Sequence, residues 1–260
     1  MKRTAGGAFL AFALLAGVAA LLRDSPAPPA ADARGVEDVV LLHGLGRSDR
    51  AMRPLADALT RAGYRVHNLT YPSLAEEPEQ LVSQVGEQID ACCAHAERLH
   101  FVTHSLGGLV ARAVLARATR ANLGRVVMLA PPNNGSAYAD LVRESKLRVD
   151  ELPPAITALG TDPESFARSL PPPSYPLGVI AGARSVNPLD PLLLAGPGDG
   201  AVSLASARLP GMRDFLVVDA THASIRRRAD VHAQVIAFLR TGAFEHAATP
   251  TRAGVAADGR

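Results

Sequence analysis

The chain has 260 residues, of which 48% are hydrophobic and 20% are charged, and its formal net charge is +2. This length and composition allow one sizeable core, which favours a single globular domain over two. No basic block is interleaved with aromatic residues, so nucleic acid is not expected as a partner. The only tight cationic cluster, three arginines at 226–228, is interpreted as the solvated start of a helix.

The cysteine content argues against disulfide and metal frameworks. Cys92 and Cys93 are the only cysteines, and they are adjacent. Neighbouring residues rarely meet disulfide geometry, so we expect no internal disulfide. The sequence has no CxxC pair, no HExxH motif and no other Cys/His spacing typical of a ligand set. We therefore expect no structural zinc.

The N-terminal segment is typical of an export signal or a membrane anchor. Lys2 and Arg3 precede an uncharged apolar stretch at residues 5–22, and such a basic start is typical of exported proteins. At about 18 residues, the stretch lies between a signal-peptide core and a short membrane span. A Pro/Ala-rich linker follows at 25–35. We predict a signal or anchor over 1–24, with the rest of the chain outside the cytoplasm, either membrane-anchored or secreted after cleavage.

From residue 36 onward, short aliphatic runs alternate with helical patterns. The expected strands cover residues 39–42, 64–69, 99–103, 125–129, 177–181 and 215–218. The expected helices cover residues 50–62, 77–94, 106–118 and 229–239. Strands that are apolar throughout and alternate with helices predict an α/β fold, with a mostly parallel sheet of about six strands and helices on both faces.

Residues from about 135 to 175 interrupt this alternation. They contain two proline clusters, at 153–154 and 171–173, among aliphatic residues. An insertion of this length is typical of a lid or a binding loop. We therefore expect a single domain over 36–242 that carries a lid insertion, followed by a flexible tail over 243–260.

The strongest chemical signal is the segment THSLGG at residues 103–108, between an expected strand and an expected helix. In a nucleophile elbow the serine stands at a strained turn, and small residues two before and two after it let strand and helix pass closely. Gly107 fills the second position, whereas Thr103 stands where glycine is usual, so the turn has to accommodate a β-branched side chain. The pattern predicts Ser105 as a nucleophile, and a helix N-cap serine is the alternative.

A second glycine-containing segment, HGLG at residues 43–46, follows the first expected strand. Glycines here let backbone amides face the nucleophile, where fixed donors stabilise the negative charge that develops on a substrate oxygen. We predict the backbone N–H groups of Leu45 and Leu106 as this oxyanion hole. His43 is interpreted as a structural residue that holds the loop.

A serine nucleophile needs a general base, and the base needs an orienting partner. His222 follows the last expected strand and precedes the final helix, so we predict it as the base above the sheet edge. Asp199 lies between two glycines and gives the chain order Ser, Asp, His. We predict Asp199 as the orienting acid, and Asp190 is the competing candidate.

The other histidines are given no chemical role. His67 and His100 flank expected strands, and we interpret them as ordinary structural residues. His95, His232 and His246 are expected to face solvent.

Together these blocks resemble the α/β-hydrolase superfamily, and specifically its small bacterial esterase- and lipase-like members. The matching segments are HGLG at 43–46, HSLGG at 104–108, GDGAVS at 198–203 and THAS at 221–224. The resemblance covers about residues 36–242 and implies a carboxylesterase- or lipase-like enzyme that cleaves small-molecule or lipid esters through an acyl-enzyme, without a cofactor. The insertion would then act as a cap over the acyl site.

The same triad also serves acyltransferases, thioesterases and amidases, and a non-catalytic scaffold of this fold is a further alternative. The resemblance to a fold does not fix the substrate. The sequence leaves the acyl chain length and the oligomeric state open.

Overall fold

The structure is a computed structural model that describes residues 35–144, 152–194 and 196–246. It divides the chain into two units, Met1–Gly35 and Val36–Arg260, and the fold belongs to the second. Its centre is one sheet in the order β2-β1-β3-β4-β5-β6, in which every neighbouring pair is parallel. The strands are β1 Asp38–Leu42, β2 Arg65–Leu69, β3 Leu99–His104, β4 Leu123–Leu129, β5 Leu177–Gly182 and β6 Asp214–Val218. All six expected strands and the parallel α/β fold are confirmed.

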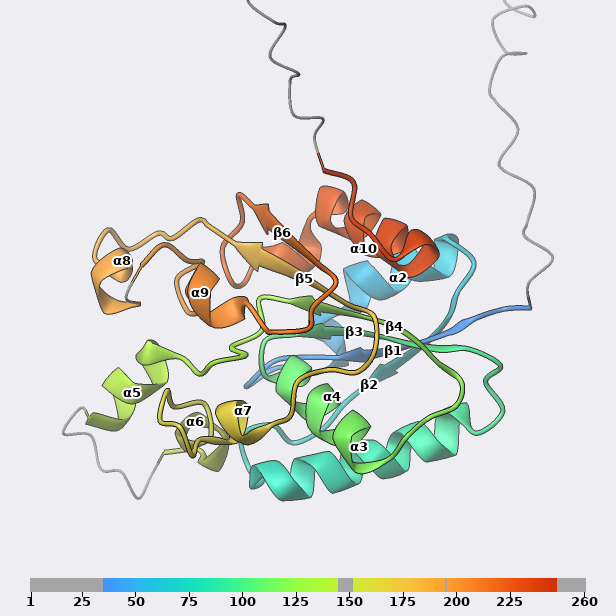
Figure 1. Ribbon diagram of the computed structural model, residues 1–260, viewed down its shortest axis with the longest axis horizontal. Helices are drawn as coiled ribbons and strands as arrows, with labels where there is room; N and C mark the ends of the chain where they lie inside the picture. The colour runs from blue at the N-terminus through green and yellow to red at the C-terminus, as the bar shows by residue number, and fades with distance from the viewer. Residues whose placement is uncertain (1–34, 145–151, 195, 247–260) are drawn as a thin grey trace, which may run out of the picture. The chain divides into compact units, whose positions relative to one another are not determined.

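Long helices cover both faces of this sheet (Figure 1). They are α2 Arg53–Arg61 and α10 Ala229–Thr241 on one face, and α3 Pro78–Cys93 and α4 Leu106–Arg117 on the other. Side chains alternate between the faces of a strand, and the core divides accordingly. Val39 of β1 packs in the cluster that includes α2 and α10, whereas Val40 packs in the cluster that includes α3 and α4.

The strand order creates a switch point beside β1. After β1 the chain first adds β2 on one side, and it then returns to add β3 on the other side. In open parallel sheets, the loops that leave the carboxyl ends of strands on either side of such a point diverge and leave a crevice for ligands. The loop after β1 carries HGLG, and the turn after β3 carries Ser105, so both predicted motifs lie at this point.

The expected helix at 50–62 forms in two pieces. A 3-10 turn, η1 at Asp49–Ala51, precedes α2, and Met52 stands between them. Pro54 lies in the first turn of α2. Because proline lacks a backbone N–H, it is tolerated at the start of a helix and not in its interior, so the longer helix is interrupted at this place.

Shorter helices gather at the carboxyl end of the sheet. The insertion between β4 and β5 contains α5 Ala137–Glu144, α6 Pro154–Thr157 and α7 Phe166–Ser169, and the chain between β5 and β6 contains α8 Asp190–Leu193 and α9 Leu204–Ala207. In Figure 1, α5, α8 and α9 lie at the end toward which the strand arrows point. Helices α5, α6 and α7 thus occupy the segment at 135–175 that interrupts the alternation of strands and helices.

A buried arginine of α4 holds the base of this insertion. The guanidinium of Arg112 donates to the carbonyl oxygens of Asn133 at 3.2 Å, Ala167 at 3.3 Å and Leu170 at 2.9 Å. Burial lowers the pKa of Arg112. Because helix α4 begins at the elbow, these bonds connect the insertion to the element that carries the nucleophile.

The expectation that the two cysteines stay unpaired is wrong. Cys92 and Cys93 form a disulfide with each other at the end of α3. The bridge joins two consecutive residues, with Cα atoms 3.8 Å apart, directly before the C-cap residue Ala94.

No helix in the described ranges is long and apolar enough to cross a membrane. The predicted anchor at 1–24 and most of the predicted linker lie outside the described residues, as does the tail from 247. The final helix α10 ends before Gly242, which adopts the left-handed conformation usual for a helix C-cap (φ 82°).

Candidate active site

The predicted elbow is a strained turn between β3 and α4. Ser105 has φ 54° and ψ −125°, a conformation that non-glycine residues rarely adopt. Its N–H donates to the carbonyl oxygen of Leu129 at 2.9 Å. A Cβ at Gly107 would lie 2.6 Å from the carbonyl oxygens of Leu42 and His43, so only glycine allows α4 to pass this close to β1. The surrounding backbone therefore holds Ser105 in its strained conformation.

Thr103, the departure from the usual elbow, is accommodated by the helix opposite it. The side chain of Thr103 is fully buried, and its Oγ1 has no hydrogen-bond partner among the described residues. A Cβ at Gly108 would lie 3.3 Å from this oxygen. The second glycine of the motif thus provides the space that the β-branched side chain takes up.

The structure brings the three predicted triad residues together. Nε2 of His222 lies 2.9 Å from Oγ of Ser105, and Nδ1 of His222 lies 2.9 Å from Oδ2 of Asp199. An ionised carboxylate only accepts hydrogen bonds, so Nδ1 carries the proton and Nε2 is left to accept the proton of the Ser105 hydroxyl. This geometry is suited to a serine nucleophile and its general base.

The turn around Asp199 fixes the carboxylate in place. Its Oδ1 accepts the N–H groups of Ala201 at 3.0 Å and Val202 at 2.8 Å, which leaves Oδ2 for His222. The backbone N–H of His222 also donates to the carbonyl oxygen of Asp199 at 2.9 Å. The Asp199 side chain is 1% exposed, so the carboxylate depends on these donors in place of water.

The competing acid, Asp190, lies on the side of this turn formed by Gly200. It is buried at the start of α8, where its carboxylate accepts a hydrogen bond from the Ser185 hydroxyl. A Cβ at Gly200 would lie 3.4 Å from Oδ2 of Asp190. Within the described ranges, Asp190 makes no hydrogen bond to His222, so of the two candidates the structure places only Asp199 in contact with the imidazole.

A second imidazole, that of His104, supports the imidazole of His222, and no role was predicted for it from the sequence. Nε2 of His104 donates to the backbone carbonyl oxygen of His222 at 2.9 Å, and the two ring centroids lie 4.9 Å apart. Burial, and next the proximity of His222, lower the pKa of His104 well below its ordinary value. His104 is therefore neutral at neutral pH. It precedes Ser105 directly, which is the only signal in the sequence that could have indicated it.

The segment after β2 packs against the HGLG loop and forms hydrogen bonds with it. The His43 ring stacks on Tyr71, with ring centroids 4.2 Å apart, and its Nδ1 donates to the carbonyl oxygen of Gly44. The N–H of Tyr71 donates to Nε2 of His43 at 3.3 Å, and the N–H of Gly46 donates to Oγ of Ser73 at 3.0 Å. Burial lowers the pKa of His43. These contacts agree with a structural His43 and add Tyr71 and Ser73 to the residues that shape the site.

The backbone donors predicted for the oxyanion hole have no acceptor in the described part of the chain. Leu106 is the first residue of α4, and the first N–H groups of a helix lack an intrahelical acceptor. The Leu45 N–H has no hydrogen-bond partner among the described residues. The loop backbone also lies close to the nucleophile, since a Cβ at Gly44 would lie 3.0 Å from Cβ of Ser105. Both amides are thus available to a substrate oxygen.

One of the histidines expected to face solvent does not. His232 is buried on the inner side of α10, and its Nε2 donates to the carbonyl oxygen of Arg226 at 2.9 Å. The turn before α10 folds back over this side of the helix, which the sequence pattern did not reveal. His95 and His246 are exposed as expected, and His100 is buried within β3.

The arginine cluster at 226–228 also differs from the expected solvated helix start. Arg226 is buried, and its Nε donates to the carbonyl oxygen of Ala51 at 3.0 Å. Arg227 is exposed, and Arg228 pairs with Asp230 at 2.7 Å. Only the last two therefore fit the interpretation made from the sequence.

Among the described residues, the side chains of His67, Cys92 and Cys93 lie close together, and all three are of types that can bind a metal ion. The possible ligand atoms of His67, Cys92 and Cys93 all lie within 4.8 Å of one another. The two sulfur atoms are bonded to each other, and metals bind the thiolate form of cysteine. Nε2 of His67 also contacts Oδ1 of Asp38 at 2.7 Å. In this form the group offers no set of free ligands.

A comparison with family models finds similarity to the palmitoyl protein thioesterase family over residues 38–161. This segment contains β1 to β4, the HGLG loop and Ser105, and it ends before Asp199 and His222. The comparison with curated proteins found no significant match.

Solved structures extend the similarity over most of the chain. The mature lipase BlEst2 of Bacillus licheniformis is 19% identical with a TM-score of 0.66, covering 83% of this chain and 96% of that one. The phospholipase PlaB of Legionella pneumophila is 15% identical with a TM-score of 0.62, covering 81% of this chain and 60% of that one. The metagenomic carboxyl esterase MGS0156 is 20% identical with a TM-score of 0.56, covering 78% and 71%. These structures share the fold described above.

Proposed function

We propose that the chain is a serine hydrolase of the α/β-hydrolase superfamily and that it cleaves carboxylic esters through an acyl-enzyme on Ser105. The observation that carries the proposal is the pair of 2.9 Å contacts of His222, one to Ser105 and one to Asp199. A buried carboxylate, an imidazole and a strained serine in this order are what acyl transfer requires.

The reaction would proceed in two steps. Oγ of Ser105 attacks the ester carbonyl carbon, and its proton passes to Nε2 of His222. The oxygen that becomes negative is stabilised by the N–H groups of Leu45 and Leu106. The imidazolium, stabilised by Asp199, then protonates the leaving alkoxide, and the acyl group stays on Ser105. Water attacks the acyl-enzyme, gives its proton to His222 and releases the acid, and the proton returns to Ser105.

The position and the exposed side chains of the insertion at 135–175 support the proposal that it forms a cap over the acyl group. Oγ of Ser136, at its start, donates to the carbonyl oxygen of Ala201 at 2.8 Å, directly beside the Asp199 turn. Its helix α5 presents Tyr138 and Leu141 with 40% and 47% of their surfaces exposed. Exposed apolar side chains near a lipase-like site are suited to contact an acyl chain.

Thioester cleavage is a second candidate, because the matching family model describes a palmitoyl protein thioesterase. The residues of the mechanism are the same, and only the leaving atom changes from oxygen to sulfur. A thiolate is a better leaving group than an alkoxide, so preference for thioesters has to be judged against the intrinsic reactivity of each substrate. Acyltransferases and amidases use the same triad, and a non-catalytic scaffold would retain the fold without turnover.

Fluorophosphonate labelling tests the proposal. The full-length protein should be labelled at Ser105, and the S105A variant should not, with circular dichroism unchanged. The matched control is S83A, which removes an exposed hydroxyl on α3 and should leave labelling intact. Normal labelling of S105A would contradict the assignment of the nucleophile, and no labelling of the folded wild-type protein would favour the scaffold.

Substrate series separate the candidates. Hydrolysis of p-nitrophenyl esters of increasing acyl length gives the chain-length preference. Oxygen esters and thioesters of one acyl chain, each compared with its uncatalysed rate, show which bond the site prefers. Product analysis with an added alcohol or amine acceptor shows whether water is the main acceptor.

A further inference from the structure

A cationic hollow of about 430 Å³ lies beside the candidate active site. Four arginines line it, Arg47 and Arg50 from the loop after β1 and Arg226 and Arg227 from the turn η3 at Ile225–Arg227. We call it the arginine pocket. The two segments are about 175 residues apart in the chain, and the fold brings them together, since Nε of Arg226 donates to the carbonyl oxygen of Ala51.

Each of the two segments that line the arginine pocket is directly connected to a loop of the candidate active site. On one wall, the N–H of Arg47 donates to the carbonyl oxygen of Gly44 at 3.2 Å, and Gly44 lies against Ser105. The other wall follows His222 closely, since the N–H of Ile225 donates to the carbonyl oxygen of Thr221 at 3.1 Å. A ligand group in the pocket would therefore be held next to the loops that carry the nucleophile's amide donor and its base.

Protein carboxylates neutralise little of the positive charge of this pocket, where Asp49 acts on Arg50 without forming an ion pair with it. No acidic residue lines it, and within the described ranges Arg47, Arg50 and Arg227 form no ion pair. The neighbouring Asp49 instead pairs with Arg53 at 3.7 Å and accepts from Thr70. Burial, and next the charges of Arg227 and Arg47, lower the pKa of Arg226.

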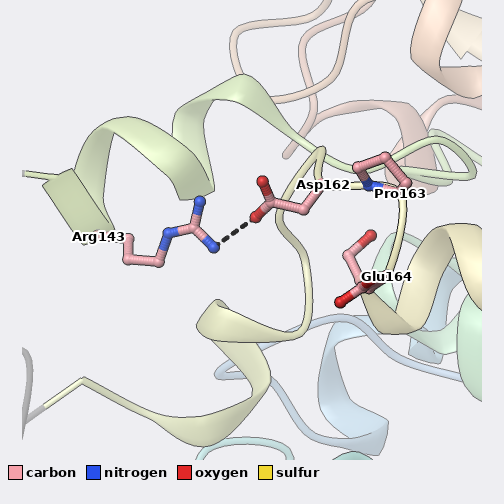
Figure 2. A pocket seen from close by; sticks show the side chains of 5 residues that line it. Arg143, Asp162, Pro163 and Glu164 are labelled. Carbon is pink, nitrogen blue, oxygen red and sulfur yellow. Dashed lines mark hydrogen bonds and ion pairs between the residues drawn. The ribbon is translucent and has the colours of Figure 1, made fainter.

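A second hollow, in the insertion, shows the opposite arrangement (Figure 2). There Arg143 pairs with Asp162 at 2.7 Å and with Asp140 at 3.3 Å, and Glu164 lines the same space. Its one cation is thus neutralised within the protein. Within the part of the chain that the structure describes, the arginines of the arginine pocket lack such ion pairs. The pocket is therefore suited to an external anion, because guanidinium groups gathered in a concave surface attract anions.

The chemistry of the lining indicates which anion. Guanidinium groups form paired hydrogen bonds to planar or tetrahedral oxyanions, and several of them together favour a group with more than one charge, such as phosphate. Leu74, which is 47% exposed, borders Gly46 at the edge of the pocket, 3.6 Å from a Cβ placed there. An apolar side chain therefore adjoins the cationic surface.

We propose that the arginine pocket binds a phosphate group carried by the acyl substrate, so that the enzyme prefers phosphate-bearing acyl esters to neutral ones. This rests on the proposed hydrolase function and deepens it. The phosphate could belong to a lipid headgroup or to a soluble ester, and the recognition chemistry is the same for both.

Two soluble substrates with the same short acyl chain test the preference, a glycerol ester and the corresponding glycerol phosphate ester, both below their aggregation concentrations. In the full-length protein, kcat/KM should be higher for the phosphate ester. Replacing both exposed arginines, Arg47→Gln with Arg227→Gln, should lower the ratio of phosphate ester to neutral ester by roughly tenfold or more, because hydrogen bonds to charged groups are lost. Arg61→Gln, an exposed arginine at the far end of α2, is the matched control and should leave the ratio unchanged.

A binding measurement separates this proposal from the hydrolase proposal. In the S105A variant, the phosphate ester should bind more tightly than the neutral ester, and adding the two arginine substitutions should remove the difference. Equal affinities in both proteins at low ionic strength would overturn the arginine pocket, whether or not the wild-type enzyme turns over either ester.

Two further outcomes identify the source of the phosphate. If vesicles that contain a phosphorylated acyl lipid show the same arginine-dependent preference as the soluble ester, the pocket accepts a lipid headgroup. If only the soluble ester shows it, a soluble substrate is favoured. If the two arginines affect only adsorption to anionic vesicles and neither soluble measurement, they act as a membrane contact and the proposed phosphate subsite is wrong.

Discussion

The side chain of His104 donates from Nε2 to the backbone carbonyl oxygen of His222, at 2.9 Å. The contact joins the residue before the nucleophile to the residue that would act as its base, although they are separated by 118 positions. It fixes the backbone from which the His222 imidazole projects, while Asp199 fixes the ring itself. His104 is therefore a positioning residue.

Replacing His104 with alanine should lower kcat by about 10- to 100-fold, with KM little changed, because the base would lose part of its alignment with Ser105. His104→Gln should retain more activity than His104→Ala, since the amide can still donate to the same carbonyl oxygen. Steady-state kinetics and the rate of fluorophosphonate labelling give the readout. The control is His95→Ala, an exposed histidine. Equal losses in kcat for the alanine and glutamine variants would contradict a role through this hydrogen bond.

Asp199→Asn should reduce turnover far more than Asp190→Asn. An amide in place of the orienting carboxylate disfavours the productive tautomer of His222, and in the well-studied serine protease triad such a change costs about four orders of magnitude in kcat. Asp190 contacts Ser185 instead of the imidazole, so its loss should act mainly on stability. Kinetics on a p-nitrophenyl ester, with a urea unfolding curve for each variant, separate the two effects. A greater loss of turnover in Asp190→Asn would make Asp190 the acid.

Thr103→Val should raise the free energy of unfolding by about 1 kcal/mol, because it removes a buried hydroxyl that has no partner among the described residues and keeps the shape of the side chain. Thr103→Gly should keep most of the activity, since glycine is usual at this position, but should lower the free energy of unfolding by about 1–3 kcal/mol through lost packing and added chain freedom. Urea unfolding and kcat/KM measure both. A valine variant that is less stable than the wild type would show that the hydroxyl has a partner.

Arg112→Leu should destabilise the protein by about 2–4 kcal/mol, because it leaves several buried carbonyl oxygens of the insertion without a donor. The insertion should also become more sensitive to limited proteolysis. The control on the same helix is Arg117→Ala, whose exposed pair with Glu79 should contribute less than about 1 kcal/mol. Unchanged stability and unchanged proteolysis in Arg112→Leu would refute its role as the anchor of the insertion.

The catalytic domain is predicted to lie outside the cytoplasm, with Lys2 and Arg3 retained on the inner side of the membrane by the positive-inside tendency. In intact spheroplasts of a bacterium that expresses the chain, external protease should therefore cut the domain. Deleting residues 2–24 should leave it in the cytoplasm and protected until lysis. A full-length domain that stays protected in intact spheroplasts would overturn this topology.

The sequence by itself determined the sheet and the chain order of the candidate site. Apolar strands alternate with helices, and burial on both faces of a parallel sheet explains this pattern for the inner strands β1, β3, β4 and β5. The edge strands β2 and β6 are only partly buried, and their place in the alternation predicts them. Ser105 and His222 each follow a strand, and parallel strands end at the same edge, so their proximity could be expected. Asp199 could be preferred to Asp190 for its glycine-flanked turn, although both lie between β5 and the histidine.

The tertiary structure decided the features that depend on contacts between distant segments. The burial of Arg226 and His232 follows from the packing of η3 on the loop after β1 and on α10, and no local periodicity records such packing. The same holds for the contact of His104 with His222 and for the bonds of Arg112 to the insertion. The arginine pocket exists because the loops after β1 and β6 meet at one end of the sheet, where charges that look ordinary along the chain become neighbours in space.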